Sequence, residues 1–173
     1  MVDICKCYTQ WFPASRFIGI KYGEEDRIDG GFGQQWGTWF EEGRFPVLER
    51  LLNEDYMKSY EDAPNYIGLM RWKDNEPFQY WIGMFMPPDS QVPEGYRFVD
   101  LPEAKLGVCW LQGPEYELYG QEEKCGIRLR QEGYEVVADE EGAWWFFERY
   151  GCPRFTKPDE QNRRILDICH FVK

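Results

Sequence analysis

WWFFERY, the run from Trp144 to Tyr150, places a carboxylate among aromatic side chains in a segment with strong strand character. Side chains alternate across a β-strand, so Phe146, Glu148 and Tyr150 share one face and Arg149 points to the other. A carboxylate between aromatic neighbours is costly to bury unless it is protonated or paired with a cation. The run therefore predicts either a ligand pocket or, as the simpler alternative, a salt bridge to an arginine or an exposed sheet edge.

Further strand-like and helical patterns lie on both sides of this run. The expected strands are Phe17–Tyr22, Tyr66–Trp72, Phe78–Met86, Ala104–Leu111 and Ile165–Val172. A stripe of aromatic side chains at helical spacing, which includes Trp36, predicts a helix that ends near Gly43. Pro46 suits the first turn of a second short helix, and another helix is expected within residues 115–132.

The order of these elements is the same in two halves of the chain: strand, helix, strand, strand. We expect one domain over residues 1–173, with pseudo-repeats at roughly residues 16–88 and 103–173. Runs of strands followed by separate helices indicate the α+β class. The predicted architecture is an antiparallel sheet with helices on one face and a ligand groove between the halves.

The sequence resembles the GyrI-like family, which includes the effector-binding domains of multidrug-responsive bacterial transcription regulators. The resemblance rests on FIGIKYG, on the Trp-rich helix, on FQYWIGMFM and LGVCWLQG, and above all on FFERYGCPRF from Phe146 to Phe155. The family's Glu-x-Tyr pattern matches Glu148 and Tyr150. Two departures stand out: 173 residues leave no room for a DNA-binding module, and Ile165–Val172 lacks the proline of many relatives.

The resemblance implies a set of ligand-binding residues around the central groove. It places Trp81 and Trp110 on strands that border the groove, although either ring alone could equally fill the core. Trp36 is a candidate for the rim, close to the start of its helix. Tyr66 and Met84 are weaker candidates, since such side chains are more often core. The full predicted set is Trp36, Tyr66, Trp81, Met84, Trp110, Glu148 and Tyr150.

Composition narrows the classes of partner. The formal charge of −11 argues against nucleic acid, because a phosphate backbone demands a basic surface. No apolar run is long enough for a membrane span, and six cysteines without an export signal indicate reduced thiols in the cytoplasm. A single histidine and the absence of CxxC or phosphate-loop motifs predict no metal and no cofactor. The sequence carries no signal for an oligomeric state.

Three functions fit the resemblance. The first is binding of aromatic, lipophilic or cationic xenobiotics, which the 18% aromatic content favours. The second is hydrolysis of cyclopropane-bearing DNA-alkylating compounds, known within the family, in which Glu148 and Tyr150 would be catalytic beside an aromatic cage. The third is a protein–protein role, as in the family's gyrase-inhibiting member.

Overall fold

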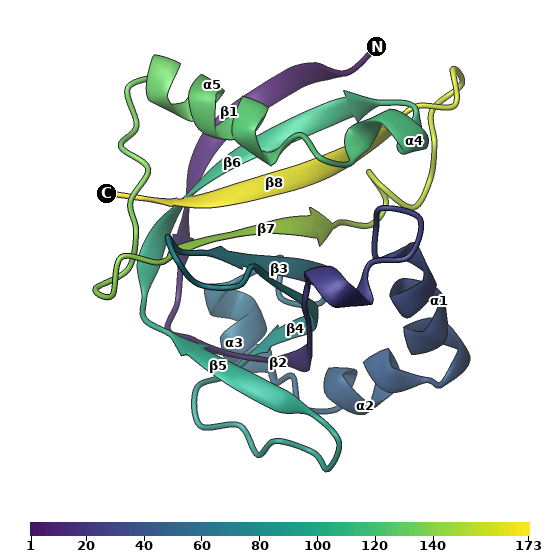
Figure 1. Cartoon of the computed structure of the whole chain (residues 1–173), viewed down its shortest axis with the longest axis vertical. Coiled ribbons are helices and arrows are strands. Elements are labelled where there is room, and N and C mark those ends of the chain that lie inside the picture. Colours follow the sequence, from purple (N-terminus) through teal and green to yellow (C-terminus); the bar gives the residue numbers. More distant parts are fainter.

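The structure is a computed structural model that describes residues 1–173, and it confirms the α+β class (Figure 1). Eight strands form one antiparallel sheet in the order β1-β6-β8-β7-β3-β4-β2-β5. The strands are β1 Asp3–Phe12, β2 Ser15–Tyr22, β3 Tyr66–Trp72, β4 Gln79–Met86, β5 Arg97–Leu101, β6 Ala104–Gly113, β7 Trp144–Tyr150 and β8 Arg164–Val172. The helices are α1 Gly33–Glu41, α2 Arg44–Glu49, α3 Glu54–Ser59, α4 Glu115–Leu118 and α5 Glu122–Gln131, with a 3₁₀ turn at Glu24–Asp26.

The two halves of the sheet have the same strand order, β2-β4-β3 and β6-β8-β7, and they meet where β3 pairs with β7. Three cross-strand pairs at this junction face one side of the sheet: Tyr66 with Tyr150, Gly68 with Glu148, and Met70 with Phe146. The centre of the sheet is therefore the place where the aromatic side chains and the carboxylate of β7 come together.

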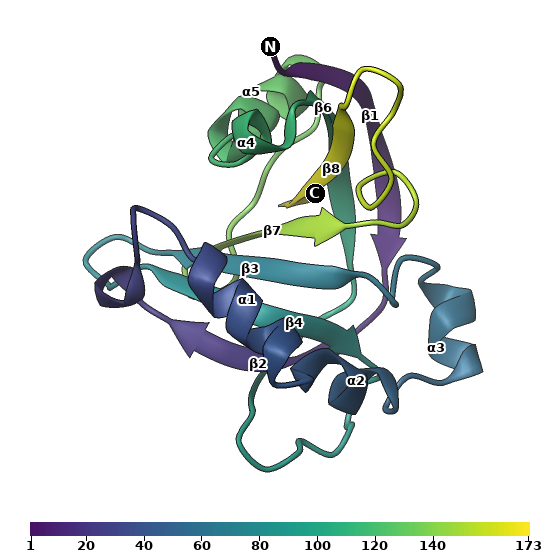
Figure 2. The same cartoon turned by 90° about the vertical axis from the view of Figure 1, so that its right-hand side faces the viewer.

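Two pairs of helices pack on this face of the sheet, one pair on each half. The helices α1 and α2 pack on the first half through Trp39, Phe45 and Leu48. The helices α4 and α5 pack on the second half through Leu118 and Leu129. Figure 2 shows the two helix pairs on either side of β3 and β7. Side chains of α1 and α2 also reach the central strands, where Trp36 meets Tyr150 of β7 and Phe45 stacks on Tyr66 of β3.

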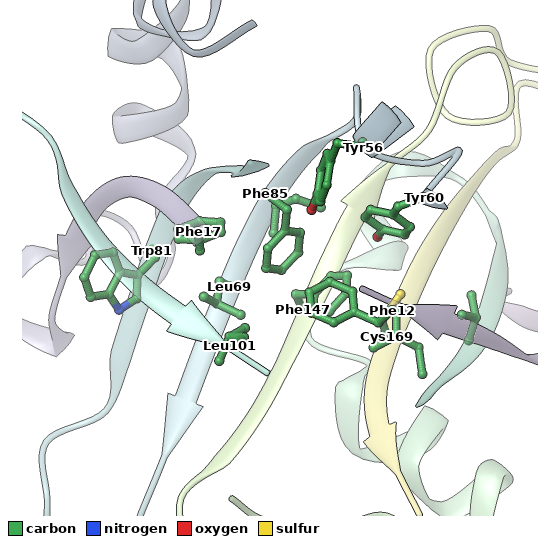
Figure 3. Close-up of a cluster of buried hydrophobic side chains, with 14 residues drawn as sticks. Phe12, Phe17, Tyr56, Tyr60, Leu69, Trp81, Phe85, Leu101, Phe147 and Cys169 are labelled. Atoms are coloured by element: carbon green, nitrogen blue, oxygen red, sulfur yellow. The ribbon is translucent and has the colours of Figure 1, made fainter. Parts of the chain in front are cut away.

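The opposite face of the sheet curls around a separate aromatic core (Figure 3). The ring of Phe12, at the end of β1, packs against other aromatic rings. Its centroid lies 5.0 Å from that of Phe85 on β4 and 5.5 Å from that of Phe171 on β8. The short helix α3 closes this core with Tyr56, so the helices do not all lie on one face as expected. None of the helices combines the length and the apolar character needed to cross a membrane.

Four features of the structure differ from the sequence prediction: β1, β5, α3 and the helix expected within residues 115–132. The edge strands β1 and β5 lie in segments for which no strand was expected, because exposed edge strands carry a weak hydrophobic pattern. The helix α3 was likewise not expected. The single helix predicted within residues 115–132 is divided into α4 and α5, since Gly120 between them has a φ of +76° and interrupts the helix.

Candidate functional site

A cavity of about 1380 Å³ opens over the junction of β3 and β7. Its floor consists of side chains from the central cross-strand pairs, including Tyr66, Met70, Phe146, Glu148 and Tyr150. The helix α1 and the turn before it supply one wall, and the segments around α4 and α5 supply the other. The cavity is larger than the roughly 300–1000 Å³ typical of small-molecule sites, which makes room for a bulky or extended ligand.

Glu148 is the buried charge of this floor, with 5% of its surface exposed. No lysine, arginine or histidine forms an ion pair with it; the carboxylate accepts a hydrogen bond from the Tyr80 hydroxyl. Burial raises the pKa of Glu148 to about 7, and the negative charge of Glu122 adds to the increase, whereas the hydroxyls of Tyr80 and Tyr150 oppose it. The group therefore titrates near neutral pH.

A chain of hydrogen bonds holds the carboxylate in place. The Trp36 indole N–H donates to the Tyr80 hydroxyl at 2.9 Å, and that hydroxyl donates in turn to Glu148. Burial, followed by the nearby Glu148 charge, raises the pKa of Tyr80 well above its usual value, so Tyr80 remains a donor. The Tyr80 ring stacks on Phe32 at 4.2 Å with an interplanar angle of 2°. Trp36 and Phe32 thus fix the orientation of the donor.

Glycine at position 68 makes this arrangement sterically feasible. A Cβ atom on Gly68 would lie 2.4 Å from the Glu148 carboxylate and 2.5 Å from the Tyr80 hydroxyl oxygen. Any larger residue would displace one of the two groups, because such distances are far below van der Waals contact. The absence of a side chain directly opposite Glu148 therefore leaves room for its hydrogen bond to Tyr80.

Aromatic rings stand on both sides of the carboxylate. Trp36 meets Tyr150 edge to face at 4.9 Å, and Tyr150 meets Phe155 in the same way at 4.7 Å. Tyr66 stacks on Phe45 at 3.7 Å. Of these rings, Trp36, Tyr66, Tyr150 and Phe155 line the cavity, and aromatic rings attract flat apolar groups and cations.

Acidic side chains outnumber basic ones in the lining of the cavity. The lining contains one cationic side chain, Arg27, and five carboxylates, those of Glu49, Glu115, Glu122, Glu123 and Glu148. Of the five, Glu115 is paired with Arg164, which lies outside the lining. The Arg27 guanidinium is bound by Glu24, with nitrogen–oxygen distances of 2.8 and 3.1 Å. The cavity is therefore a region of negative potential that favours cations and disfavours anions.

Four of the seven predicted ligand-binding residues line the cavity: Trp36, Tyr66, Glu148 and Tyr150. Trp36 projects from α1 and the other three from β3 and β7. Met84 faces the same side of the sheet, but it is fully buried beneath α1 and α2. Its expected place in the groove is wrong, because the helix pair occupies the space above it.

Trp81 and Trp110 lie on the opposite face of the sheet, which corrects their expected place beside Glu148. Trp81 pairs across the strands with Leu69 and packs against Phe17 in the aromatic core (Figure 3). Trp110 pairs with Asp167, whereas Glu148 pairs with Ile168, the next residue on β8. A difference of one position in register sends the side chains to opposite faces.

Several cavity residues were not predicted. Tyr80 and Phe32 are the most important, since they position the carboxylate. Alternation along FQYWIGMFM was the available signal for Tyr80, because Tyr80 and Trp81 must face opposite sides and only one can meet Glu148. The Gly30-Gly31 segment also lines the cavity. No group of three or more His, Cys, Asp or Glu side chains is placed to hold a metal ion.

Several solved structures share this fold. SAV2435, solved bound to tetraphenylphosphonium, has a TM-score of 0.66 at 20% identity, over 97% of this chain and 94% of its own. EcmrR, solved in a complex with DNA, has a TM-score of 0.58 at 13% identity over 97% of this chain; the match spans 57% of EcmrR. A hydrolase encoded by lin2189 from Listeria innocua has a TM-score of 0.53 at 13% identity, over 97% and 92% of the two chains.

No protein-family model and no curated relative matches the sequence. The structural likenesses show that the chain shares the fold of SAV2435, EcmrR and the Listeria hydrolase, in agreement with the fold class that the sequence predicts. At these identities the likeness concerns the fold.

Proposed function

We propose that this protein binds lipophilic aromatic cations in the central cavity and that Glu148 supplies the countercharge. One observation carries the proposal: a carboxylate that is 95% buried lines a large aromatic cavity and has no cationic partner in the protein. Burying an ionised carboxylate without a partner is unfavourable. A cationic ligand would supply the missing charge.

The rings contribute the rest of the proposed binding energy. Trp36 and Tyr150 can hold a cation or a flat ring beside Glu148, and each such contact contributes about 0.5–2 kcal/mol. Stacking is tolerant of ligand shape, because it needs no directional hydrogen bond. We therefore expect a range of lipophilic cations, including xenobiotics and drugs, to bind. The tetraphenylphosphonium bound to SAV2435 belongs to this chemical class.

The test uses two ions of nearly identical shape and opposite charge. Tetraphenylphosphonium should bind and quench tryptophan fluorescence, whereas tetraphenylborate should bind far more weakly. In Glu148→Gln, tetraphenylphosphonium affinity should fall by roughly a hundredfold, as expected for loss of one partner of a desolvated ion pair. Glu103→Gln is the control, because Glu103 is exposed and has no ionic partner.

Two results would contradict the proposal. One is equal affinity of the wild type for the phosphonium and the borate, which would show that shape alone decides. The other is an unchanged phosphonium affinity in Glu148→Gln, which would remove Glu148 from the binding site.

A second candidate function is hydrolysis of a reactive small molecule, such as a cyclopropane-bearing alkylating compound. The observation that favours it is the pKa of Glu148, which at about 7 suits a general base that activates water. In this reading Tyr150 and Trp36 would form the aromatic cage, since Trp81 and Trp110 face the other side. Mass spectrometry would detect a hydrated product that the wild type forms and Glu148→Gln does not.

A further inference from the structure

Among the carboxylates of the cavity that form no ion pair, Glu122 is the one besides Glu148 that is not exposed, since Glu49 and Glu123 are exposed to solvent. Glu122 is the first residue of α5; its side chain is half-buried and lines the same cavity as Glu148. Its backbone oxygen lies 2.9 Å from Nε2 of His170. The His170 ring stacks on Phe146 at 5.5 Å, so Glu122 is anchored above the Phe146 end of the floor.

Glu148 occupies a separate position along the same strand. It lies two residues beyond Phe146 on the same face of β7, which corresponds to about 6–7 Å along the strand. Trp36 and Tyr150 stand beside it, whereas Phe146 lies at the Glu122 end. The cavity thus has two positions, each with a carboxylate and aromatic surface.

No cation of the protein neutralises either position. Arg27 is the one basic side chain of the lining, and it is already bound by Glu24 and by the Gly30 carbonyl oxygen at 3.2 Å. His170, which is buried against α5, has a pKa lowered by burial to about 4 and is neutral near pH 7. Burial raises the pKa of Glu122, and the backbone N–H of Glu122 and the charge of Arg27 oppose this increase only in part. The charge of Glu122 in turn raises the pKa of Glu148.

We propose that the preferred ligands of this cavity are aromatic dications, with one positive group beside Glu148 and the other beside Glu122. This inference rests on the proposed cation-binding function and specifies its ligand class. A monocation beside Glu148 leaves the second carboxylate without a countercharge. A dication satisfies both, and a cavity of about 1380 Å³ can hold two aromatic groups joined by a linker.

The test compares one ligand series with its monovalent parent. The probes are butyltriphenylphosphonium and alkane-bridged bis(triphenylphosphonium) dications with linkers of increasing length. We expect the dication with the best-fitting linker to bind the wild type about tenfold more tightly than butyltriphenylphosphonium does, because a second charge pair forms. Glu122→Gln and Glu122→Ala should reduce this ratio to roughly one, whereas Glu148→Gln should weaken both ligands.

Calorimetry in buffers of different ionisation enthalpy gives an independent readout. In mildly acidic buffer, dication binding should release more protons than monocation binding, because the pKa of both carboxyls is raised and both must ionise. Glu122→Gln should remove the difference, and Glu103→Gln should leave the affinity ratio and the proton release unchanged.

The outcomes separate this inference from the proposed function. If the monocation binds in a Glu148-dependent manner but no dication binds more tightly, the inference is wrong and the proposed function stands. An affinity ratio that survives both Glu122 variants would also overturn the inference. If neither kind of ligand binds the wild type, the proposed function itself fails.

Discussion

Glu148 and Arg149 are neighbours in the chain, but their side chains lie on opposite faces of the sheet and only Arg149 has ionic partners. The Arg149 guanidinium is fully buried and lies 2.8 Å from Asp167 and 3.4 Å from Asp62. Glu148 has no cationic partner and accepts a hydrogen bond from the Tyr80 hydroxyl. Strand alternation thus keeps the nearest positive charge in the structural core and leaves the carboxylate of the cavity uncompensated.

The first prediction concerns the stability of Glu148→Gln. The folded-state pKa of Glu148 is raised to about 7 from the ordinary value of 4.5, so the native state is penalised once the group ionises. The penalty is absent below about pH 4.5, grows as pH rises and is complete above about pH 7. We expect Glu148→Gln to increase the free energy of unfolding by about 3 kcal/mol near pH 8 and by little near pH 4.5. Urea denaturation at the two pH values measures this, and a less stable variant at pH 8 would contradict it.

The second prediction concerns the buried arginine on the other face. Asp167 and Asp62 each bind two arginines, Arg149 and Arg154. Replacing Arg149 by methionine removes one of these two positive charges. We expect the free energy of unfolding to fall by roughly 3 kcal/mol or more, because buried charges lose a partner. Arg163→Met is the matched control: its pair with Asp159 is exposed and should contribute about 0–1 kcal/mol. Equal effects of the two substitutions in denaturant titrations would refute this prediction.

The third prediction uses two glycines with different surroundings. Gly68→Ala should lower stability on the order of 1–3 kcal/mol and weaken cation binding, because the new methyl group displaces Glu148 or Tyr80. Gly37 lies in α1, and a Cβ atom at this position would meet no atom within 4 Å outside the helix's own backbone. Gly37→Ala should therefore stabilise the helix by up to about 1 kcal/mol. Thermal unfolding and phosphonium titration of both variants check this pair of outcomes. A Gly68→Ala protein with unchanged binding would mean that the carboxylate is not confined as described.

The fourth prediction concerns the hydroxyl that holds Glu148. Tyr80→Phe removes a donor that favours the ionised carboxylate, so the pKa of Glu148 should rise by about one unit. Cation affinity near neutral pH should decrease several-fold, roughly in proportion to the ionised fraction. Tyr22→Phe is the control, because the Tyr22 hydroxyl likewise accepts a hydrogen bond from a tryptophan, Trp39, at 3.0 Å but does not lie in the cavity beside Glu148. An unshifted midpoint in the pH dependence of binding for Tyr80→Phe would argue against this role.

The sequence predicted the fold class and the core strands because their hydrophobic patterns are strong. The alternation in WWFFERY also placed Glu148 and Tyr150 on one face, and the structure shows both side chains on the floor of the cavity. The edge strand β1 could not be predicted in this way, since its exposed residues carry little pattern. Its pairing with β6 is a long-range contact that local propensity does not encode.

The errors at Trp81 and Trp110 have a common physical origin. Periodicity tells which residues of one strand share a face, but not how the faces of separate strands are aligned. That alignment depends on register, which here pairs Gly68 with both Glu148 and Ile82. Tyr80 and Ile82 therefore share the face of Glu148, whereas Trp81 does not.

The pH dependence of tetraphenylphosphonium affinity, in the wild type and in Glu148→Gln, tests the central claim most directly. If the cation binds only when Glu148 is ionised, a pKa of about 7 predicts roughly tenfold weaker binding near pH 6 than near pH 8. Glu148→Gln should bind weakly and equally at the two pH values. The same tenfold change in Glu148→Gln, or a flat profile in the wild type, would contradict the assignment of Glu148 as the countercharge.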